Sequence, residues 1–223
     1  MSVEFTGDDS LIDESTLTGG EISQVGMTIA ARVKVNTSQT DVTARFMTVA
    51  DQRNIEDCVS MYYTTNGDDV RVQIRVGATN FTAAIGINIT NDVWHSYAVV
   101  IEDANTYSAY EDGSITVDSA TITNGPVTDD IFDIQLGGRI VTAQDMEGKV
   151  ADCAVWNTAL TDDQAIALTG GMSPLAIQPS NLKSHVPMLH DIYQDRMQLF
   201  NIIDAGTTPT LDNSDNPAIL FPE

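Results

Sequence analysis

One stretch decides the fold of this chain: EGKVADCAVWNTALTDDQAIALTGG, from Glu147 to Gly171. It begins as an apolar segment that ends at Trp156, continues as a short acidic segment and stops at paired glycines. This order is typical of a β-strand followed by a short helix that folds back on the sheet, with the Trp156 ring packed under the helix. We interpret Glu147–Gly171 as a structural strand-and-helix unit, called the buckle below, and not as an active site.

The buckle predicts a helix over about residues 162–168. Thr161 and Gln164 have the Thr-x-x-Gln spacing of a capping box, in which each side chain satisfies a backbone N–H of the other residue. Asp162 and Asp163 make the first turn acidic, which suits the positive end of the helix dipole. Leu160 can pack against Ala165 across the cap. Gly170 and Gly171 can end the helix in a left-handed conformation.

Elsewhere the sequence alternates with a period of two. Val70–Val76 reads VRVQIRV, apolar on one face and polar on the other, which predicts a half-buried strand. Similar segments, separated by turn residues such as Asn66-Gly67 and Asp112-Gly113, are Met27–Val35, Phe46–Val49, Cys58–Tyr63 and Phe81–Ile89. Val93–Ile101 is more continuously apolar and predicts a central strand. The sequence therefore predicts an all-β fold, a two-sheet antiparallel jelly-roll sandwich with one short helix.

The sandwich is expected over residues 1–175, followed by a proline-interrupted C-terminal extension over 176–223. Six of the seven prolines lie from Pro174 onward, and such a segment cannot supply central strands. The extension is expected to return as an edge strand near 199–203 or 218–221. It either packs on its own domain or reaches a neighbouring subunit.

Composition limits the classes of partner. Thirty-two acidic residues against 10 basic ones give a net charge of −22, and the basic residues are scattered, which excludes a nucleic-acid-binding protein. The excess acid either keeps the protein soluble or binds cations or a basic protein surface. No apolar run is long enough to span a membrane, and the N-terminus lacks a signal-peptide pattern. Cys58 and Cys153 lie in apolar segments, so reduced thiols and synthesis in a host cytoplasm are expected.

The order of the motifs resembles a known family. The segments are VEFTGDDSLI and GMTIAARVKV near the start, VWHSYAVVIEDANTYSAYEDGS at 93–114, LGG at 136–138, and the buckle. Together they resemble the concanavalin A-like lectin/glucanase superfamily, in its laminin G-like (pentraxin-like) branch, as found in phage virion proteins. The resemblance covers residues 3 to about 175 and implies a jelly roll with one concave sheet. Its members include glycosidases, sugar-binding modules and particle-surface domains, so the fold alone does not select a function.

Catalysis by a glycosidase needs two carboxylates that flank the sugar bond. The resemblance implies paired glutamates on one strand, but the closest two glutamates, Glu14 and Glu21, are seven residues apart. Asp145 and Glu147 have suitable spacing but are expected in a loop. The three histidines, His95, His185 and His190, are not accompanied by a nucleophile motif. No catalytic residue is predicted.

Calcium is the one cofactor that the sequence suggests. The resemblance implies a structural or ligand-bridging calcium ion, which prefers oxygen ligands. Asp8 and Asp9, after the opening strand, are the first candidates. Further acidic turns occur at 129–130 and 212–215, and all of these carry the alternative interpretation of solvated turns.

A lectin site would require exposed aromatic side chains on the concave sheet. The candidates are Tyr62, Tyr63, Tyr107 and Tyr110. Tyr62 and Tyr63 are successive strand residues, so they point to opposite faces and cannot both contact a sugar. Core or edge packing is the expected role of most of the four.

Three functions remain open. The first hypothesis is a non-enzymatic virion structural protein, a capsid decoration or accessory protein on the virion surface of a tailed phage. Its partners would be other virion proteins, namely the major capsid protein or itself as a homo-oligomer. The alternative is a carbohydrate-binding, lectin-like adhesion module with glycans as partners, and the third is a glycoside hydrolase.

Overall fold

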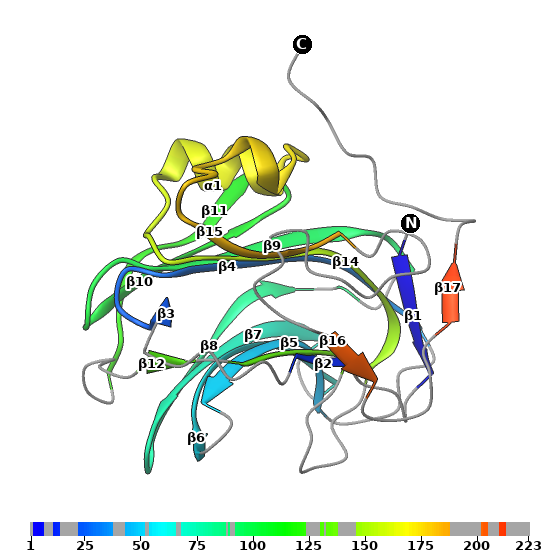
Figure 1. Ribbon diagram of the computed structural model, residues 1–223, viewed down its shortest axis with the longest axis horizontal. Helices are drawn as coiled ribbons and strands as arrows, with labels where there is room; N and C mark the ends of the chain where they lie inside the picture. Colours follow the sequence, from blue (N-terminus) through cyan, green and yellow to red (C-terminus); the bar gives the residue numbers. More distant parts are fainter. Residues whose placement is uncertain are drawn as a thin grey trace.

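The computed structural model describes residues 2–6, 11–13, 22–37, 43–51, 54–65, 68–87, 89, 92–123, 130–131, 133–137, 146–187, 202–204 and 210–212. Two antiparallel sheets stack face to face, and a short helix covers the outer side of one of them (Figure 1). The predicted all-β, two-sheet antiparallel jelly-roll sandwich is confirmed.

Sheet A has eight strands in the order β11-β10-β9-β4-β14-β1-β17, with β15 also paired to β14. Their bounds are β1 Ser2–Thr6, β4 Thr28–Val35, β9 His95–Ile101, β10 Thr106–Glu111, β11 Ser114–Thr121, β14 Glu147–Trp156, β15 Leu182–Val186 and β17 Thr210–Asp212. The apolar segment predicted as a central strand is β9, which lies between β10 and β4.

Sheet B has seven strands in the order β16-β2-β13-β5-β6-β7-β8. Their bounds are β2 Leu11–Asp13, β5 Thr43–Asp51, β6 Asn54–Thr64, β7 Asp69–Val76, β8 Thr79–Ile87, β13 Asp133–Leu136 and β16 Ile202–Asp204. Sheet B is arched, and its hollow side points away from sheet A (Figure 1). A separate pair joins β3 (Ile22–Ser23) to β12 (Asp130–Ile131).

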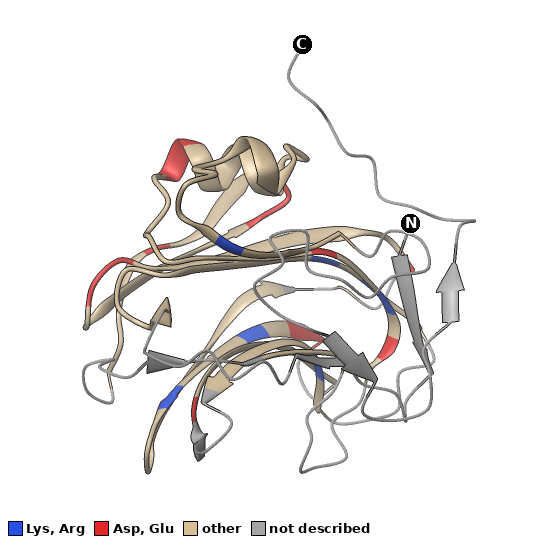
Figure 2. Ribbon diagram, viewed as in Figure 1, with Lys and Arg blue, Asp and Glu red and all other residues tan. Residues whose placement is uncertain are grey.

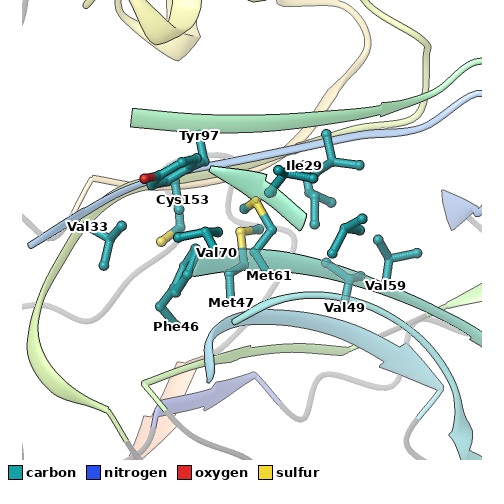
Figure 3. Close-up of a cluster of buried hydrophobic side chains, with 14 of the residues drawn as sticks. Ile29, Val33, Phe46, Met47, Val49, Val59, Met61, Val70, Tyr97 and Cys153 are labelled. Atoms are coloured by element: carbon teal, nitrogen blue, oxygen red, sulfur yellow. The ribbon is translucent and has the colours of Figure 1, made fainter. Parts of the chain in front are cut away.

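The main core lies between the two sheets (Figure 3). Sheet A contributes side chains such as Ile29, Val33 and Tyr97, and sheet B contributes Phe46 and Met47, all 0% exposed. Phe46 and Met47 are consecutive yet both join the core, because a register shift in the β5–β6 pairing lies between Arg45 and Met47. The apolar residues of the alternating segments therefore face the interior of the sandwich, as predicted.

A second, smaller core lies between sheet A and helix α1, Asp162–Thr169. Trp156, the last residue of β14, is fully buried there, and its indole Nε1 donates a hydrogen bond to the carbonyl oxygen of Ile177 at 2.9 Å. Both hydrogen bonds of the Thr161–Gln164 capping box are present. The buckle is therefore a structural element, as the sequence predicts.

The described strands beyond residue 176 all pair with strands of the same chain. β15 pairs with β14, β16 with β2 and β17 with β1. Each of them lies at an edge, consistent with the proline content. Residues 218–221 lie outside the described part, and the domain boundary near residue 175 stays a prediction. In the part that the structure describes, no helix is both long and apolar enough to cross a membrane.

Candidate functional site

The outer, hollow face of sheet B is polar. Val70, Val72 and Ile74 enter the core, so the alternating residues Arg71, Gln73 and Arg75 of β7 point outward. Alternation is ordinary for a sheet with one packed face, but it does not determine how the outward side chains of different strands line up. That alignment comes from the register.

The register places an uncharged polar side chain from five neighbouring strands in one continuous line. Gln135 of β13 pairs with Thr48 of β5, which pairs with Ser60 of β6. Ser60 pairs with Gln73 of β7, and Gln73 pairs with Thr82 of β8. We call these five residues the polar row. Their hydroxyl and amide groups both donate and accept hydrogen bonds, which is the chemistry that matches sugar hydroxyls.

A second line, containing two arginines, lies beside the polar row. Arg45 of β5 pairs with Tyr62 of β6, which pairs with Arg71 of β7. The Arg45 guanidinium carbon lies 5.3 Å from the centre of the Tyr62 ring, within range of a cation–π interaction. Burial raises the pKa of Tyr62, so this side chain stays neutral at physiological pH.

The outer face has a buried half and an exposed half. Thr48, Ser60 and Gln135 are at most 2% exposed, whereas Asn80 and Thr82 on β8 are exposed. The Thr48 hydroxyl and the Gln135 side-chain oxygen have no hydrogen-bond partner among the described residues. These two groups can therefore still form hydrogen bonds, and leaving them buried without a partner is costly.

The exposed half is formed by five side chains that we call the platform: Arg71, Gln73 and Arg75 from β7, and Asn80 and Thr82 from β8.

Contacts within the sheet hold the platform side chains in place. The Gln73 side-chain oxygen accepts a hydrogen bond from Arg45 Nη2 at 2.7 Å, and its amide nitrogen donates to Asn80 Oδ1 at 2.9 Å. Arg71 Nε donates to both Asp69 oxygens at 3.0 and 3.2 Å, and this pairing raises the pKa of Arg71. Arg75 Nε donates to the carbonyl oxygen of Gly77 at 3.2 Å. Side chains fixed in this way lose less entropy when they bind a ligand.

The described outer-face side chains of sheet B include one carboxylate, Asp69, which is engaged by Arg71. Figure 2 shows both blue and red positions on the strands of this sheet. A glycosidase needs a second carboxylate across the sugar bond, and the described part of this face does not supply one.

The predicted aromatic candidates separate clearly. Tyr63 and Tyr107 lie in the main core, and Tyr110 lies in the second core near α1, where its hydroxyl donates to Asp162 at 2.8 Å. Tyr62 alone of the four is on the outer face of sheet B, but it is 9% exposed and lies against Arg45. Core packing, the role expected for most of the four, is therefore confirmed for three of them, and the platform is polar.

Several predicted site residues lie outside the described residues: the calcium candidates Asp8 and Asp9, together with Glu14, Glu21, Asp145 and His190. The calcium site stays a prediction. Glu147 is described, and it is the first residue of β14 instead of the loop residue that we expected. Its backbone joins the ladder with Thr6 of β1.

One group of described side chains has the composition of a metal site. Ligand atoms of His95, Glu111 and Asp112 all lie within 4.8 Å of one another. They contact one another and their neighbours: Asp112 accepts from the Ser96 N–H at 2.7 Å, and Glu111 accepts from the Tyr97 hydroxyl at 2.7 Å. His95 Nδ1 lies 2.7 Å from Asp112 Oδ2. These contacts account for the cluster as an ion pair at the end of sheet A.

The His95 ion pair predicts a pH dependence of stability. The hydrogen bond with Asp112 raises the pKa of His95 above its usual value of about 6.5, because it favours the protonated ring, although burial opposes the shift. A raised pKa means that the stabilisation is complete below about pH 6.5 and is lost as the pH rises through the folded-state pKa. We expect wild type to exceed His95→Gln in urea midpoint by more at pH 5.5 than at pH 9. The same difference at both pH values would contradict the prediction.

Sequence reasoning missed a second polar cluster on the outer face of sheet A. Asp152, with a positive φ of 48° at an irregularity in β14, lies 3.2 Å from His185 Nε2 and 3.9 Å from Arg32 Nε. All three side chains are nearly fully buried, and burial lowers the pKa of Arg32. The cavity beside Arg32 and Asp152 has a volume of about 10 Å³, room for roughly one water molecule and too small for a ligand. We therefore assign this cluster a structural role.

Comparisons with solved structures agree with this architecture. The CBM40 module of the Ruminococcus gnavus IT-sialidase has a TM-score of 0.55 and 17% identity, over 76% of this chain and 98% of that one. A proposed carbohydrate-binding protein from Bacteroides ovatus has a TM-score of 0.67 and 15% identity, over 97% of this chain and 60% of that one. The SAP-like pentraxin of Limulus polyphemus has a TM-score of 0.54 and 16% identity, over 75% and 81%. At these identities the similarity establishes the fold.

A comparison with protein families gives a match over residues 8–165, to the laminin G-type model described as the concanavalin A-like lectin/glucanases superfamily. No curated protein matches the sequence. The family match covers the three middle segments of the resemblance in full and parts of the first and last, and the two packed antiparallel sheets are those that the resemblance implied. The chain belongs to the concanavalin A-like lectin/glucanases superfamily.

Proposed function

We propose that this protein is a non-catalytic carbohydrate-binding domain that binds a glycan on the platform of sheet B. The observation that carries the proposal is the polar row. Five hydroxyl and amide side chains from five strands lie in register across this face. Three of them are buried, and the two that a ligand can reach, Gln73 and Thr82, belong to the platform.

The arrangement suits hydrogen bonding to a sugar better than stacking on it. The Gln73 amide is oriented by contacts on both of its ends, from Arg45 and to Asn80. Polar groups fixed in this way are what gives a binding site its specificity.

Two further observations favour binding over catalysis. The described part of the face holds one carboxylate, Asp69, and that group is already paired with Arg71. The structural neighbours include a sialidase's CBM40 module that was solved bound to alpha2,3 sialyllactose. That module shares 16% identity with this chain, so it supports sugar binding as a class of function and leaves the sugar open.

A glycan array tests the proposal. Wild type is expected to bind a subset of glycans, and Gln73→Ala is expected to weaken binding about tenfold, because it removes one or two hydrogen bonds worth about 1 kcal/mol each. Thr82→Ala on β8 and Thr121→Ala on β11 form a matched pair, since both threonines are exposed on edge strands of the two sheets. Only Thr82→Ala is expected to reduce binding.

The result that overturns the proposal is an array without bound glycans, given a wild-type protein that melts cooperatively. Equal binding by Gln73→Ala, Thr82→Ala and Thr121→Ala would instead move the site away from the platform. Thermal melts of each variant separate lost binding from lost folding.

A role on a virion surface stays a second hypothesis, which rests on the resemblance in sequence. It is compatible with glycan binding, because a particle-surface domain with this fold can also bind a sugar. Mass spectrometry of purified particles tests it, together with a search for an oligomer interface larger than about 1,000 Å². A monomer that is absent from particles would rule the hypothesis out.

A further inference from the structure

We propose that the platform binds an unbranched glycan of at least three sugar units, which lies parallel to strands β7 and β8. The inference rests on the proposed function and specifies the class of ligand. Its starting point is the change in exposure across the outer face of sheet B.

Exposure on this face rises stepwise from β6 to β8. The outward side chains of β6 are nearly fully buried, those of β7 are half-buried and those of β8 are exposed. In that order they are Cys58, Ser60 and Tyr62, then Arg71, Gln73 and Arg75, then Asn80, Thr82 and Ala84. The surface that a ligand can reach among these side chains is therefore a strip two strands wide, which we call the strip.

The strip follows the strands and does not cross them. The polar row crosses five strands, but Gln135, Thr48 and Ser60 at its inner end are at most 2% exposed. A ligand laid along the polar row would therefore contact only Gln73 and Thr82. A ligand laid parallel to β7 and β8 meets accessible side chains along its whole length.

The register divides the strip into three rungs, each a residue of β7 paired with a residue of β8. The rungs are Arg75 with Asn80, Gln73 with Thr82, and Arg71 with Ala84. Successive rungs are about 7 Å apart, because alternate residues of a strand point to the same face. The first and third rungs are therefore about 14 Å apart. A single sugar ring is too small to contact both of them.

The two ends of the strip differ. Asp69, the next outward residue of β7 beyond Arg71, is 7% exposed, so the accessible surface stops there. At the other end β7 turns into β8 at Gly77 and Ala78, and Ala78 is exposed. Three sugar units therefore fill the strip, and a longer glycan continues past this turn into solvent.

An exposed surface of this kind favours a ligand that makes several weak contacts. The strip contacts each sugar unit from one side, because its β8 side chains are exposed and β8 is the last described strand of sheet B on that side. The contacts of one unit would have to offset the whole loss of translational and rotational freedom on binding, whereas three linked units share that cost. The Gln73 amide, held by Arg45 and Asn80, is the central contact.

The glycan array and a series of chain lengths test the inference. Every arrayed glycan that binds is expected to contain an unbranched run of at least three units. Calorimetry uses cello-, laminari-, xylo- and chito-oligosaccharides of one, two, three and six units, together with the fragments of any arrayed glycan that binds. Affinity is expected to rise about tenfold or more from one unit to three, and less than about threefold from three units to six.

Variants at the two outer rungs test the position of the ligand. Ala84→Ile covers one outer rung and is expected to weaken a three-unit ligand about tenfold but a two-unit ligand less than about twofold, since two units still fit on the other rungs. Asn80→Ala, at the opposite rung, makes the same test without added bulk, with an expected loss of about fivefold for three units, the effect of one hydrogen bond. Thr121→Ile on β11 adds the same side chain as Ala84→Ile to an exposed edge strand of sheet A and is expected to have no effect.

A variant in the polar row tests the orientation. The Thr48 hydroxyl has no hydrogen-bond partner among the described residues, so Thr48→Val removes it without breaking a described hydrogen bond. Binding is expected to be unchanged, because a ligand parallel to β7 does not contact Thr48. Weaker binding by Thr48→Val in a protein that melts like wild type would show a ligand that crosses the strands.

The outcomes separate this inference from the proposed function. A single sugar that binds as tightly as three units, or a bound glycan without an unbranched run of three, would overturn the inference and retain the carbohydrate-binding function. Equal losses in Ala84→Ile and Thr121→Ile would place the ligand elsewhere and also overturn it. If no probe and no arrayed glycan binds, the function itself is removed. Thermal melts of each variant check folding.

Discussion

Replacing Trp156 with alanine is expected to lower the free energy of unfolding by about 3–5 kcal/mol, the range for removing a large aromatic side chain from a core. Trp156 is 0% exposed and lies in the second core with Ala165 and Leu168 of α1. The substitution also deprives the Ile177 carbonyl of its hydrogen-bond donor. Urea unfolding followed by circular dichroism measures the loss.

A control variant separates packing from the hydrogen bond. Trp156→Phe keeps one aromatic ring and removes the pyrrole part of the indole together with its N–H, so a smaller loss of about 1–3 kcal/mol is expected. If Trp156→Ala cost less than about 1 kcal/mol, the helix would not be anchored by this side chain. The interpretation of the buckle as a structural element would then be wrong.

Replacing Gly148 with alanine is expected to cost about 3–5 kcal/mol, because a methyl group has no room at that position. A Cβ there would lie 2.3 Å from the carbonyl oxygen of Lys34 and 2.8 Å from the Met146 methyl group. Gly148 pairs with Val35 of β4 on one side and Phe5 of β1 on the other, so a backbone shift would disturb the middle of sheet A. Overpacking and backbone strain both contribute to the expected loss.

Gly26 provides the matched control for Gly148. Its φ is 71°, but a Cβ there would have no atom within 4 Å. Gly26→Ala is therefore expected to cost only the strain of a left-handed conformation, about 1–2 kcal/mol. Thermal unfolding of the two variants side by side measures the difference. Equal losses would show that close approach of the strands is not the cause.

Local pattern predicted the fold because the relevant signals lie within a few residues of one another. Alternation in Val70–Val76 predicted β7, and the Thr161–Gln164 spacing predicted both hydrogen bonds of the helix cap. The same alternation also showed which of the β7 residues point outward. Each of these inferences depends on the repeat of one strand or one turn of helix.

The site could be predicted only in part, because it depends on register. Nothing local aligns Gln135 with Thr48, which lies 87 residues earlier in the chain (135 − 48). The positive φ of Asp152 likewise arises within β14, where neighbouring strands fix the irregularity. Assignment of Tyr62, and not Tyr63, to the outer face required the sheet to be known. Contacts between side chains of different strands therefore cannot be predicted from the pattern of a single strand.

The pairing of β1 has a consequence for how the protein is made. Val3 pairs with Val150 of β14 and with Leu211 of β17, so its nearer partner follows 147 residues later (150 − 3). At about 5–20 residues per second, a ribosome needs roughly 7–30 s to deliver that partner. During this interval β1 is a strand with two unsatisfied edges, the kind of segment through which nascent chains aggregate. Mutual repulsion among neighbouring nascent chains, each bearing far more acid than base, would keep them apart until β14 emerges.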